Sequence, residues 1–270
     1  MKSKKKLIQS VLVILLTLFV FTNFLFVRIG GDFVFRFTHE YHTPPHSTNE
    51  DLKKVRKLKY VNSLYLEFSE ITDIDFISDY SKITHISIVP TYSYTNLDSF
   101  SKFKNLESLY LSGRNIKDIQ FIKGCTDLKV LNLYECEVTD ITGISDCSML
   151  ESIYITSGDK YIIGLDELSM LPNLHHLSIG GASKHDIESI SKIEALESLS
   201  IVDNRDPIDL KCLSSMKHLE TLYIPTKNVI NTESLLNIPS LYEVKVLKGV
   251  IDDDLRRTLH LHGIKITYIE

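Results

Sequence analysis

The side chains that could do chemistry in this chain are four cysteines, ten histidines and one run of three aspartates. His39, His42 and His46 lie close together, but the letters HEYH are one residue short of the zinc-binding motif H-E-x-x-H. The sequence contains no C-x-x-C, no G-x-S-x-G and no glycine-rich phosphate loop. The aspartates, residues 252–254, stand where a helix should begin, and the helix dipole favours carboxylates there. We therefore expect no enzyme, no cofactor and no metal site.

The N-terminus has the composition of a membrane anchor. Four lysines lie within residues 1–6, and residues 7–27 form an apolar run that as a helix would span the ~30 Å hydrocarbon core. A cleaved secretory signal is the alternative, but no alanine or cysteine lies near the run to mark a cleavage or lipidation site. The sequence thus predicts a single-pass anchor in the cell membrane, a cytoplasmic basic stub and an extracytoplasmic domain, and its alanine-poor usage favours a bacterial source.

Two short segments are expected between the anchor and the rest of the chain. Residues 28–47 include two adjacent prolines, which impose extended geometry and predict a tether. Residues 48–60 predict a capping helix. Thr48 and Asp51 can form a capping box, followed by an apolar stripe made of Leu52, Val55 and Leu58.

A six-residue pattern, apolar-x-x-apolar-x-apolar, recurs through residues 61–270. Its central apolar residues are Leu64, Ile86, Leu109, Leu131, Ile153, Leu177, Leu199, Leu222, Val244 and Ile264. Successive members are 20 to 24 residues apart, which is the mark of a repeat array. In a strand, alternate side chains point to opposite faces, so Leu109 and Leu111 should face a core while Tyr110 points outward.

These hexamers resemble the leucine-rich-repeat signature, L-x-x-L-x-L followed by x-x-N/C-x-L. The second halves ITDIDFI, IKDIQFI and VTDITGI are similar to the short repeats of internalin-like bacterial surface proteins and of the phosphatase-regulator subclass. The Asn or Cys of the signature is present only at Cys136 and Asn204. The resemblance, which covers residues 61–270, implies an α/β solenoid: a horseshoe with about ten parallel strands on its concave face and short helical or 3-10 turns on its convex face.

Two polar features of the repeats carry expectations of their own. A recurring aspartate precedes the second half of several repeats and should cap the N–H groups of a convex turn, at Asp73, Asp118 and Asp140. Cys125 and Cys147 occupy equivalent positions on adjacent repeats, close enough for a disulfide. Because that position is an apolar slot, reduced and buried thiols are favoured over a bridge.

The outward positions of the strands are the candidate partner-binding surface. They place four tyrosines in nine repeats at one equivalent position, together with histidines and an asparagine beside them; the candidates are Tyr65, His85, Tyr110, Asn132, Tyr134, Tyr154, His176 and Tyr223. Tyrosine suits recognition because it offers a large rigid contact with a hydroxyl. Tyrosine also favours strands, and stacking between repeats could stabilise the ladder instead, so both interpretations stay open.

Charge restricts the class of partner. Beyond residue 45 the chain holds 24 basic and 33 acidic residues, which excludes a basic nucleic-acid footprint. We expect a protein ligand and no small-molecule substrate. Two functions fit: an adhesion or recognition domain similar in outline to the internalins, although no L-P-x-T-G sorting tail is present, or a membrane-tethered scaffold or regulator of an enzyme or envelope complex of the same cell.

Overall fold

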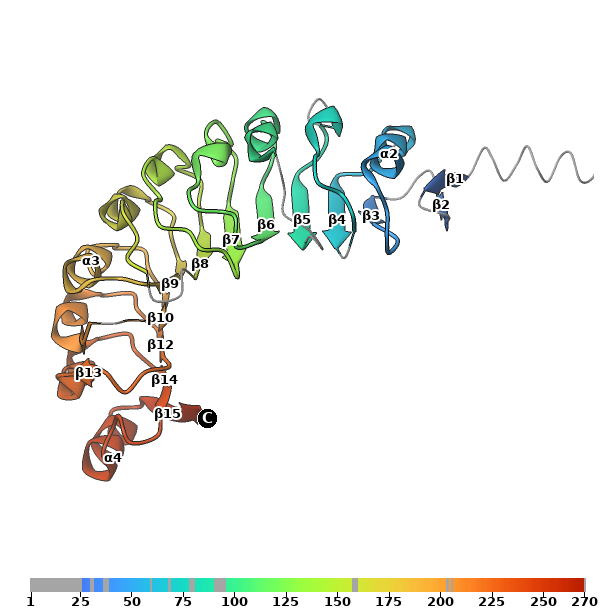
Figure 1. Cartoon of the computed structure of the whole chain (residues 1–270). Helices are drawn as coiled ribbons and strands as arrows, with labels where there is room; N and C mark the ends of the chain where they lie inside the picture. The colour runs from blue at the N-terminus through green and yellow to red at the C-terminus, as the bar shows by residue number, and fades with distance from the viewer. Residues whose placement is uncertain are drawn as a thin grey trace, which may run out of the picture.

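The described part of the chain is a curved solenoid built on one long parallel sheet. The computed structural model describes residues 26–29, 32–35, 39–58, 60–67, 69–77, 81–89, 96–156, 160–202, 204 and 206–269. The strands line the inner side of an arc and the helical turns lie outside it (Figure 1). The eleven strands of the sheet run in chain order: β3 (Glu40–His42), β4 (Ser63–Glu67), β5 (His85–Val89), β6 (Ser108–Ser112), β7 (Val130–Tyr134), β8 (Ser152–Ile155), β9 (His176–Gly180), β10 (Ser198–Val202), β12 (Thr221–Ile224), β14 (Glu243–Leu247) and β15 (Lys265–Ile269). The predicted α/β horseshoe is confirmed.

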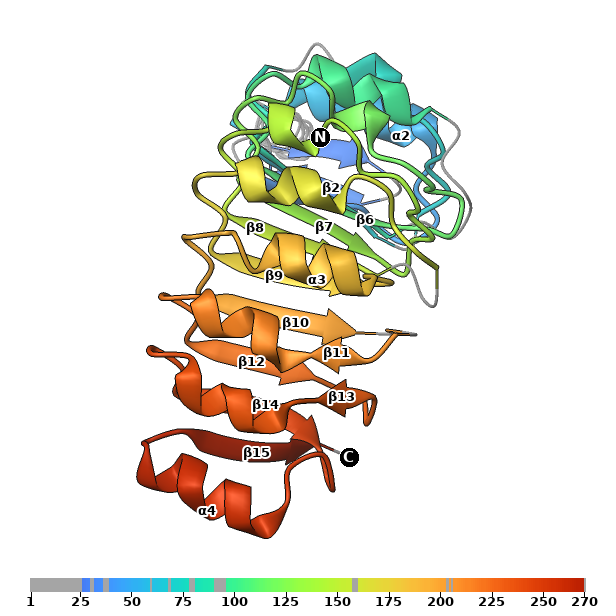
Figure 2. The same ribbon diagram turned by 90° about the vertical axis from the view of Figure 1, so that its left-hand side faces the viewer.

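Short helices cover the convex side, where they stack one above another (Figure 2). Most are 3-10 turns: η2 (Asp75–Ile77), η3 (Leu97–Lys102), η4 (Gln120–Ile122), η5 (Ile144–Asp146), η6 (Leu165–Met170), η7 (Leu210–Ser215) and η8 (Thr232–Asn237). Two are α-helices, α3 (Lys184–Ile190) and α4 (Asp253–Leu261), and β11 (Ile208–Asp209) pairs with β13 (Val229–Ile230) at the same side. Asp252 precedes α4 and accepts the backbone N–H of Leu255 at 2.7 Å, so the aspartate run does begin a helix.

The recurring aspartates cap the backbone N–H groups at the start of the convex turns, as the sequence predicted. The carboxylate of Asp73 accepts the N–H two residues later at 2.8 Å, and those of Asp118 and Asp140 do the same at 3.0 and 2.8 Å. Asp209 repeats the bond at 3.0 Å. These bonds satisfy N–H groups that a short helix leaves without a partner. The hydrogen bonds also lower the pKa of Asp140 below its ordinary value of 3.8.

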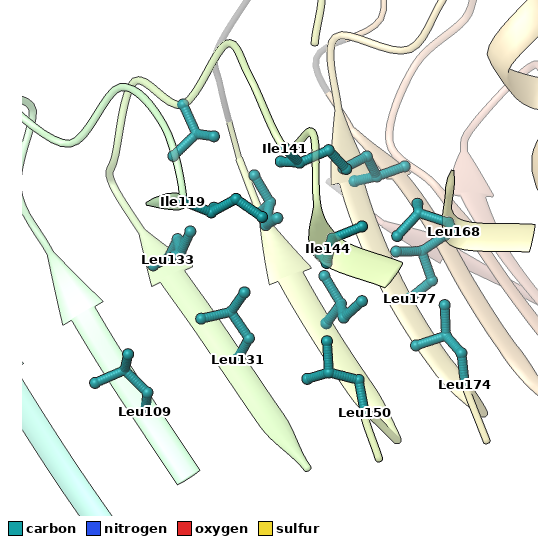
Figure 3. Close-up of a cluster of buried hydrophobic side chains, with 14 of the residues drawn as sticks. Leu109, Ile119, Leu131, Leu133, Ile141, Ile144, Leu150, Leu168, Leu174 and Leu177 are labelled. Carbon is teal, nitrogen blue, oxygen red and sulfur yellow. The ribbon is translucent and has the colours of Figure 1, made fainter. Parts of the chain in front are cut away.

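The core runs as a continuous column between the sheet and the convex turns. Strand pairing places the central apolar residue of each repeat directly beside that of the next, so Leu109 pairs with Leu131 and Leu131 with Ile153. These side chains point toward residues such as Ile119 and Ile144 that follow the strands (Figure 3). Both groups are buried, and each repeat therefore hides the apolar face of its neighbour.

The start of the solenoid differs from the expectation in one respect. Glu40–His42, inside the predicted tether 28–47, forms β3, and Tyr41 pairs with Leu64 and is buried. The spacer prediction failed there because a three-residue strand is too short to show a repeat pattern. Downstream, α2 (Asn49–Leu52) continues as η1 (Lys53–Lys57), and Asp51 accepts hydrogen bonds from the backbone and hydroxyl of Thr48 at 3.2 and 3.0 Å.

The predicted single-pass membrane localisation is wrong on the described residues. No helix among them is long and apolar enough to cross a membrane. Residues 1–25, which include the basic stub and most of the predicted anchor 7–27, lie outside the described residues. The last two residues of that run, Phe26 and Val27, belong to β1 (Phe26–Ile29), which pairs antiparallel with β2 (Asp32–Phe35) and does not continue a helix. For these two residues, apolar character did not distinguish a strand from a helix.

The last repeat is displaced by two residues from the prediction. Val244 pairs with Ile266, so Ile266 and not Ile264 is the central residue of the final strand. The letters LHGIKI fit the apolar pattern, but α4 runs to Leu261 and Gly263 adopts a positive φ of 83°. The helix therefore includes the first residue of the predicted hexamer, Leu261, and the strand begins only at Lys265.

An ion-pair network across the loops predicts a pH-dependent loss of stability. Glu137 accepts hydrogen bonds from Lys117 and Lys160 at 2.5 and 2.7 Å, which lowers its pKa from 4.5 to about 2. A pKa lower in the folded state means that this stabilisation is present above pH 4.5 and is lost as the pH falls toward 2. Glu137→Gln should unfold in less urea at pH 7, yet lose less further stability than the original chain between pH 5 and pH 2.5. Equal acid sensitivity of both chains would contradict this assignment.

Candidate functional site

The central outward position of each strand forms one column along the concave face. Backbone register aligns Tyr65, Ser87 and Tyr110 on three successive strands, then Asn132 and Tyr154 on the next two. The column continues through Ser178, Ser200, Tyr223 and Lys245. We call this line the tyrosine column. Its side chains are half-buried or exposed, with Tyr110 43% exposed, while the residues on either side of each in sequence are buried.

The other candidates flank the tyrosine column. His85 and His176 occupy the outward position before it on β5 and β9, and both side chains are exposed. Tyr134 lies at the outward position after it, at the end of β7, and is 62% exposed. All eight candidates thus lie on the open side of the sheet. Tyr223 is three strands beyond Tyr154, about 14 Å along the sheet, so one small ligand would not touch every candidate.

Tyr65, His85 and Tyr110 line a common hollow of about 530 Å³ on the concave face. Its other lining residues are Ser87, Glu107, Ser108, Lys129, Val130 and Glu151. We call it the tyrosine hollow. Ser87 lies between the two tyrosines in the register, and its small side chain leaves the space between them open. The gap at Ser87 forms one end of the hollow, which continues past Tyr110 to Lys129, Val130 and Glu151.

One wall of the tyrosine hollow is braced by an aromatic stack. The rings of His42 and Tyr65 lie 4.3 Å apart with an angle of 4° between their planes. His42 pairs with Tyr65 in the register, so it stands on the side of Tyr65 away from Ser87. Stacking fixes the ring of Tyr65 and leaves its opposite face turned toward the hollow. The histidine considered as a metal ligand from the sequence thus has an aromatic partner in the fold.

Charged side chains form the rim of the tyrosine hollow. Lys129 donates a hydrogen bond to Glu107 at 2.9 Å. That bond and the charge of Glu107 raise the pKa of Lys129 above its ordinary value of 10.5, and the charge of Glu151 adds to the effect. Glu151 forms no ion pair of its own within the part of the chain that the structure describes. Counting histidine as neutral, the rim therefore carries one negative charge in excess.

The sequence did not single out Glu107, Lys129 and Glu151. Strand alternation selected only residues within each strand, whereas these three directly precede β6, β7 and β8. Their common signal was available, since each follows the first apolar residue of its hexamer. His42 was missed for another reason: β3 carries no hexamer, so nothing indicated that it would stack on Tyr65.

The cysteines take no part in this surface. All four are free thiols; Cys125 and Cys147 are buried, and the Sγ of Cys125 donates to the carbonyl of Phe100 at 3.3 Å. Burial raises the pKa of Cys125 to about 11 and that of Cys147 to about 12. Thiols in this state are poor nucleophiles at neutral pH. The expectation of reduced, buried cysteines in an apolar slot is confirmed.

Comparison with known protein families assigns part of the repeat region to a described family. The family model described as Leucine Rich repeats (2 copies) matches residues 104–146, which span β6, η4, β7 and η5. A comparison with curated protein sequences gave no match to this chain. The described architecture and this match agree, so the chain has a leucine-rich-repeat fold, a class whose members generally serve as binding scaffolds for other proteins.

Solved structures extend the likeness beyond that segment. An internalin (inlF) of Listeria monocytogenes aligns with a TM-score of 0.53 at 17% identity, covering 89% of this chain and 90% of that one. Internalin C2 of the same species gives 0.50 at 20% identity over 80% of this chain and 85% of that one. The ectodomain of the Arabidopsis thaliana receptor kinase GASSHO1/SCHENGEN3, solved with CASPARIAN STRIP INTEGRITY FACTOR 2, gives 0.54 at 16% over 77% of this chain and 27% of that one. At these identities the likeness concerns the fold.

Proposed function

We propose that this chain binds a protein partner through its concave face, with the tyrosine column as the main contact surface. The observation that carries the proposal is the alternation along that column: Tyr65, Tyr110 and Tyr154 are separated by single small polar residues. The tyrosines therefore stand clear of one another, with their rings accessible from the open side of the sheet. Such rings offer a large apolar contact at little cost in conformational entropy.

The alternative role of the tyrosines, stacking on one another to stabilise the ladder, fits the register poorly. Adjacent strands are ~4.8 Å apart, so tyrosines on alternate strands are separated by about 9.6 Å, beyond the ~7 Å limit of ring stacking. Among the described residues, the ring contact of the tyrosine column is the one between Tyr65 and His42. Partner binding accounts for tyrosines at this spacing, whereas mutual stacking would place them on adjacent strands.

A protein partner is favoured by two further features. The column extends over many strands, a length that suits a folded surface or an extended chain better than a small molecule. The plant ectodomain that shares the fold was solved with CASPARIAN STRIP INTEGRITY FACTOR 2, which is an instance of recognition by this architecture. The acidic balance beyond residue 45 argues against nucleic acid.

Removing two rings of the column should strongly reduce capture of the partner. With Tyr110→Ala plus Tyr154→Ala, quantitative capture from an extract of the source cells is expected to fall about tenfold or more, since aromatic hot-spot residues each contribute ~2 kcal/mol or more. The matched control is Tyr161→Ala plus Tyr242→Ala. These tyrosines are similarly exposed, at 48% and 52%, but lie outside the tyrosine column. Equal loss in both double variants, or no loss in the first, would contradict the proposal.

A further inference from the structure

We propose that the tyrosine hollow receives an arginine side chain of the partner protein, held between the rings of Tyr65 and Tyr110. This inference rests on the proposed function, because it assigns one specific contact within the concave binding face. It is carried by the spacing of the rings, the orientation of Tyr65 and the charges on the rim.

The spacing of the two tyrosines fits one planar group. Tyr65 and Tyr110 stand two strands apart with Ser87 between them, a separation of about 9.6 Å at ~4.8 Å per strand. A planar group midway lies ~4.8 Å from each ring, within the ~4.5–7 Å range of stacked rings and the ~6 Å range of cation–π contacts. Ser87 is too short to fill that place itself. The hollow can therefore hold one flat side chain that contacts both rings.

The stack is partly organised before any partner arrives. His42 lies against one face of Tyr65 with the two ring planes nearly parallel. The opposite face of Tyr65 is consequently presented to the hollow, and a guest would extend the series His42, Tyr65, guest, Tyr110. Because the ring of Tyr65 is already restrained, binding loses less conformational entropy than it would with a freely rotating tyrosine.

Charge decides which flat side chain fits. Lys129 is paired with Glu107, so those two charges offset each other, while the carboxylate of Glu151 remains on the same rim. An aromatic guest would stack equally well but would leave the excess negative charge of the rim without a compensating cation. Lysine would satisfy the charge but has no plane to stack. The guanidinium of arginine provides both, and its remaining N–H groups can donate to the hydroxyls of Ser87 and Ser108 on the strands below.

The direct test is a titration with three blocked amino acids, since they isolate the side chain from any partner. N-acetyl-arginine amide, N-acetyl-lysine amide and N-acetyl-phenylalanine amide are added in turn to the full chain with isotope-labelled tyrosine rings, and the signals of Tyr65 and Tyr110 are followed by NMR. Arginine is expected to shift both signals in a saturable manner and to bind about tenfold more tightly than lysine. Absence of a saturable arginine shift, equal binding of lysine, or tighter binding of phenylalanine would each overturn the proposal.

Filling the hollow should weaken arginine binding without changing the packing of the core. Ser87→Leu places a branched side chain between the two rings and is expected to weaken arginine binding about tenfold or more. Ser200→Leu is the matched control, since Ser200 lies in the same column between Ser178 and Tyr223, with no tyrosine pair to separate. Thermal unfolding of both variants checks that they fold. Arginine binding by Ser87→Leu at the original strength would refute the assignment.

A second pair of variants tests the charge on the rim of the hollow. Glu151→Gln keeps the shape of the side chain and removes the excess negative charge of the rim. Because Glu151 precedes β8, three strands from Ser87, its charge acts through space, and arginine binding should weaken only about twofold to threefold while phenylalanine binding stays unchanged. Glu220→Gln, at the equivalent position of a distant repeat, should change neither. An unaltered preference for arginine over phenylalanine in Glu151→Gln would contradict the role given to this carboxylate.

Capture of the partner by the two kinds of variant distinguishes failure of the arginine contact from failure of the proposed function. If Tyr110→Ala plus Tyr154→Ala loses the partner while Ser87→Leu retains it, the concave face binds a protein but the hollow does not take its arginine. If both variants retain the partner, the proposed function fails as well. Loss of the partner in both, together with the arginine preference of the free chain, supports the two proposals jointly.

Discussion

Replacing Leu131 with alanine should lower the free energy of unfolding by about 2–5 kcal/mol, the range for removing a fully buried leucine side chain. Leu131 is completely buried in the middle of the sheet, with Leu109 and Ile153 as its register partners. In a repeat array each unit is stabilised mainly by its two neighbours, so a cavity here weakens two interfaces at once. Urea unfolding followed by circular dichroism measures the change.

The neighbouring residue supplies the control for that prediction. Asn132 follows Leu131 on β7 but points outward into the tyrosine column. Asn132→Ala should alter the free energy of unfolding by no more than ~0.5 kcal/mol, as is usual for surface substitutions. Similar losses for both variants would mean that the inward and outward faces of this strand have been assigned incorrectly.

Gly164→Ala is expected to cost about 2–5 kcal/mol, combining an unfavourable backbone conformation with a steric clash. Gly164 precedes η6 with a φ of 87°, where L residues other than glycine are strained. A Cβ at this position would lie 2.8 Å from the backbone N of Thr142 and 3.2 Å from the carbonyl carbon of Ile141. Because the contact is with the backbone of the preceding repeat, relief requires the two repeats to move apart.

Substitution of Gly143 separates the cost of the backbone conformation from the cost of the steric clash. It precedes η5 in the equivalent place and has a nearly identical φ of 89°, but a Cβ there would meet nothing within 4 Å. Gly143→Ala should therefore cost only the conformational part, about 1–2 kcal/mol. The difference in unfolding free energy between the two variants measures the contact between repeats. If Gly143→Ala proved as damaging as Gly164→Ala, close packing at Gly164 could not be the reason.

The repeating part of the fold could be predicted because its information is local and periodic. Each hexamer, such as LESLYL, predicts a strand, the face of that strand that points into the core, and its place in the order of repeats. The strand register confirms these predictions from Leu64 to Val244. The capping aspartates could also be predicted, since each side chain bonds to a backbone group only two residues away. Where the signal fell outside the period, as in β3 and at the final strand, the prediction was incomplete or displaced.

The candidate surface was predictable only in part. Outward positions follow from alternation alone, so Tyr65, Tyr110 and Tyr154 were found from the sequence. The hollow was not, because it depends on which residues from different repeats become neighbours across the sheet. Ser87 gains its importance only from lying between two tyrosines, and Glu151 only from reaching the rim that Lys129 shares. Finding such neighbours requires the register of the strands, and we did not derive the register from the hexamers.

The most direct test of the proposed function is to locate the partner on the solenoid by crosslinking. A photo-reactive benzoylphenylalanine is placed either at Tyr154, on the concave face, or at Met170, which is 65% exposed at the end of the convex turn η6. The partner should crosslink to the chain that carries the probe at position 154 and not to the one that carries it at position 170. Crosslinking from position 170 alone would place the partner on the convex side and contradict the role assigned to the tyrosine column.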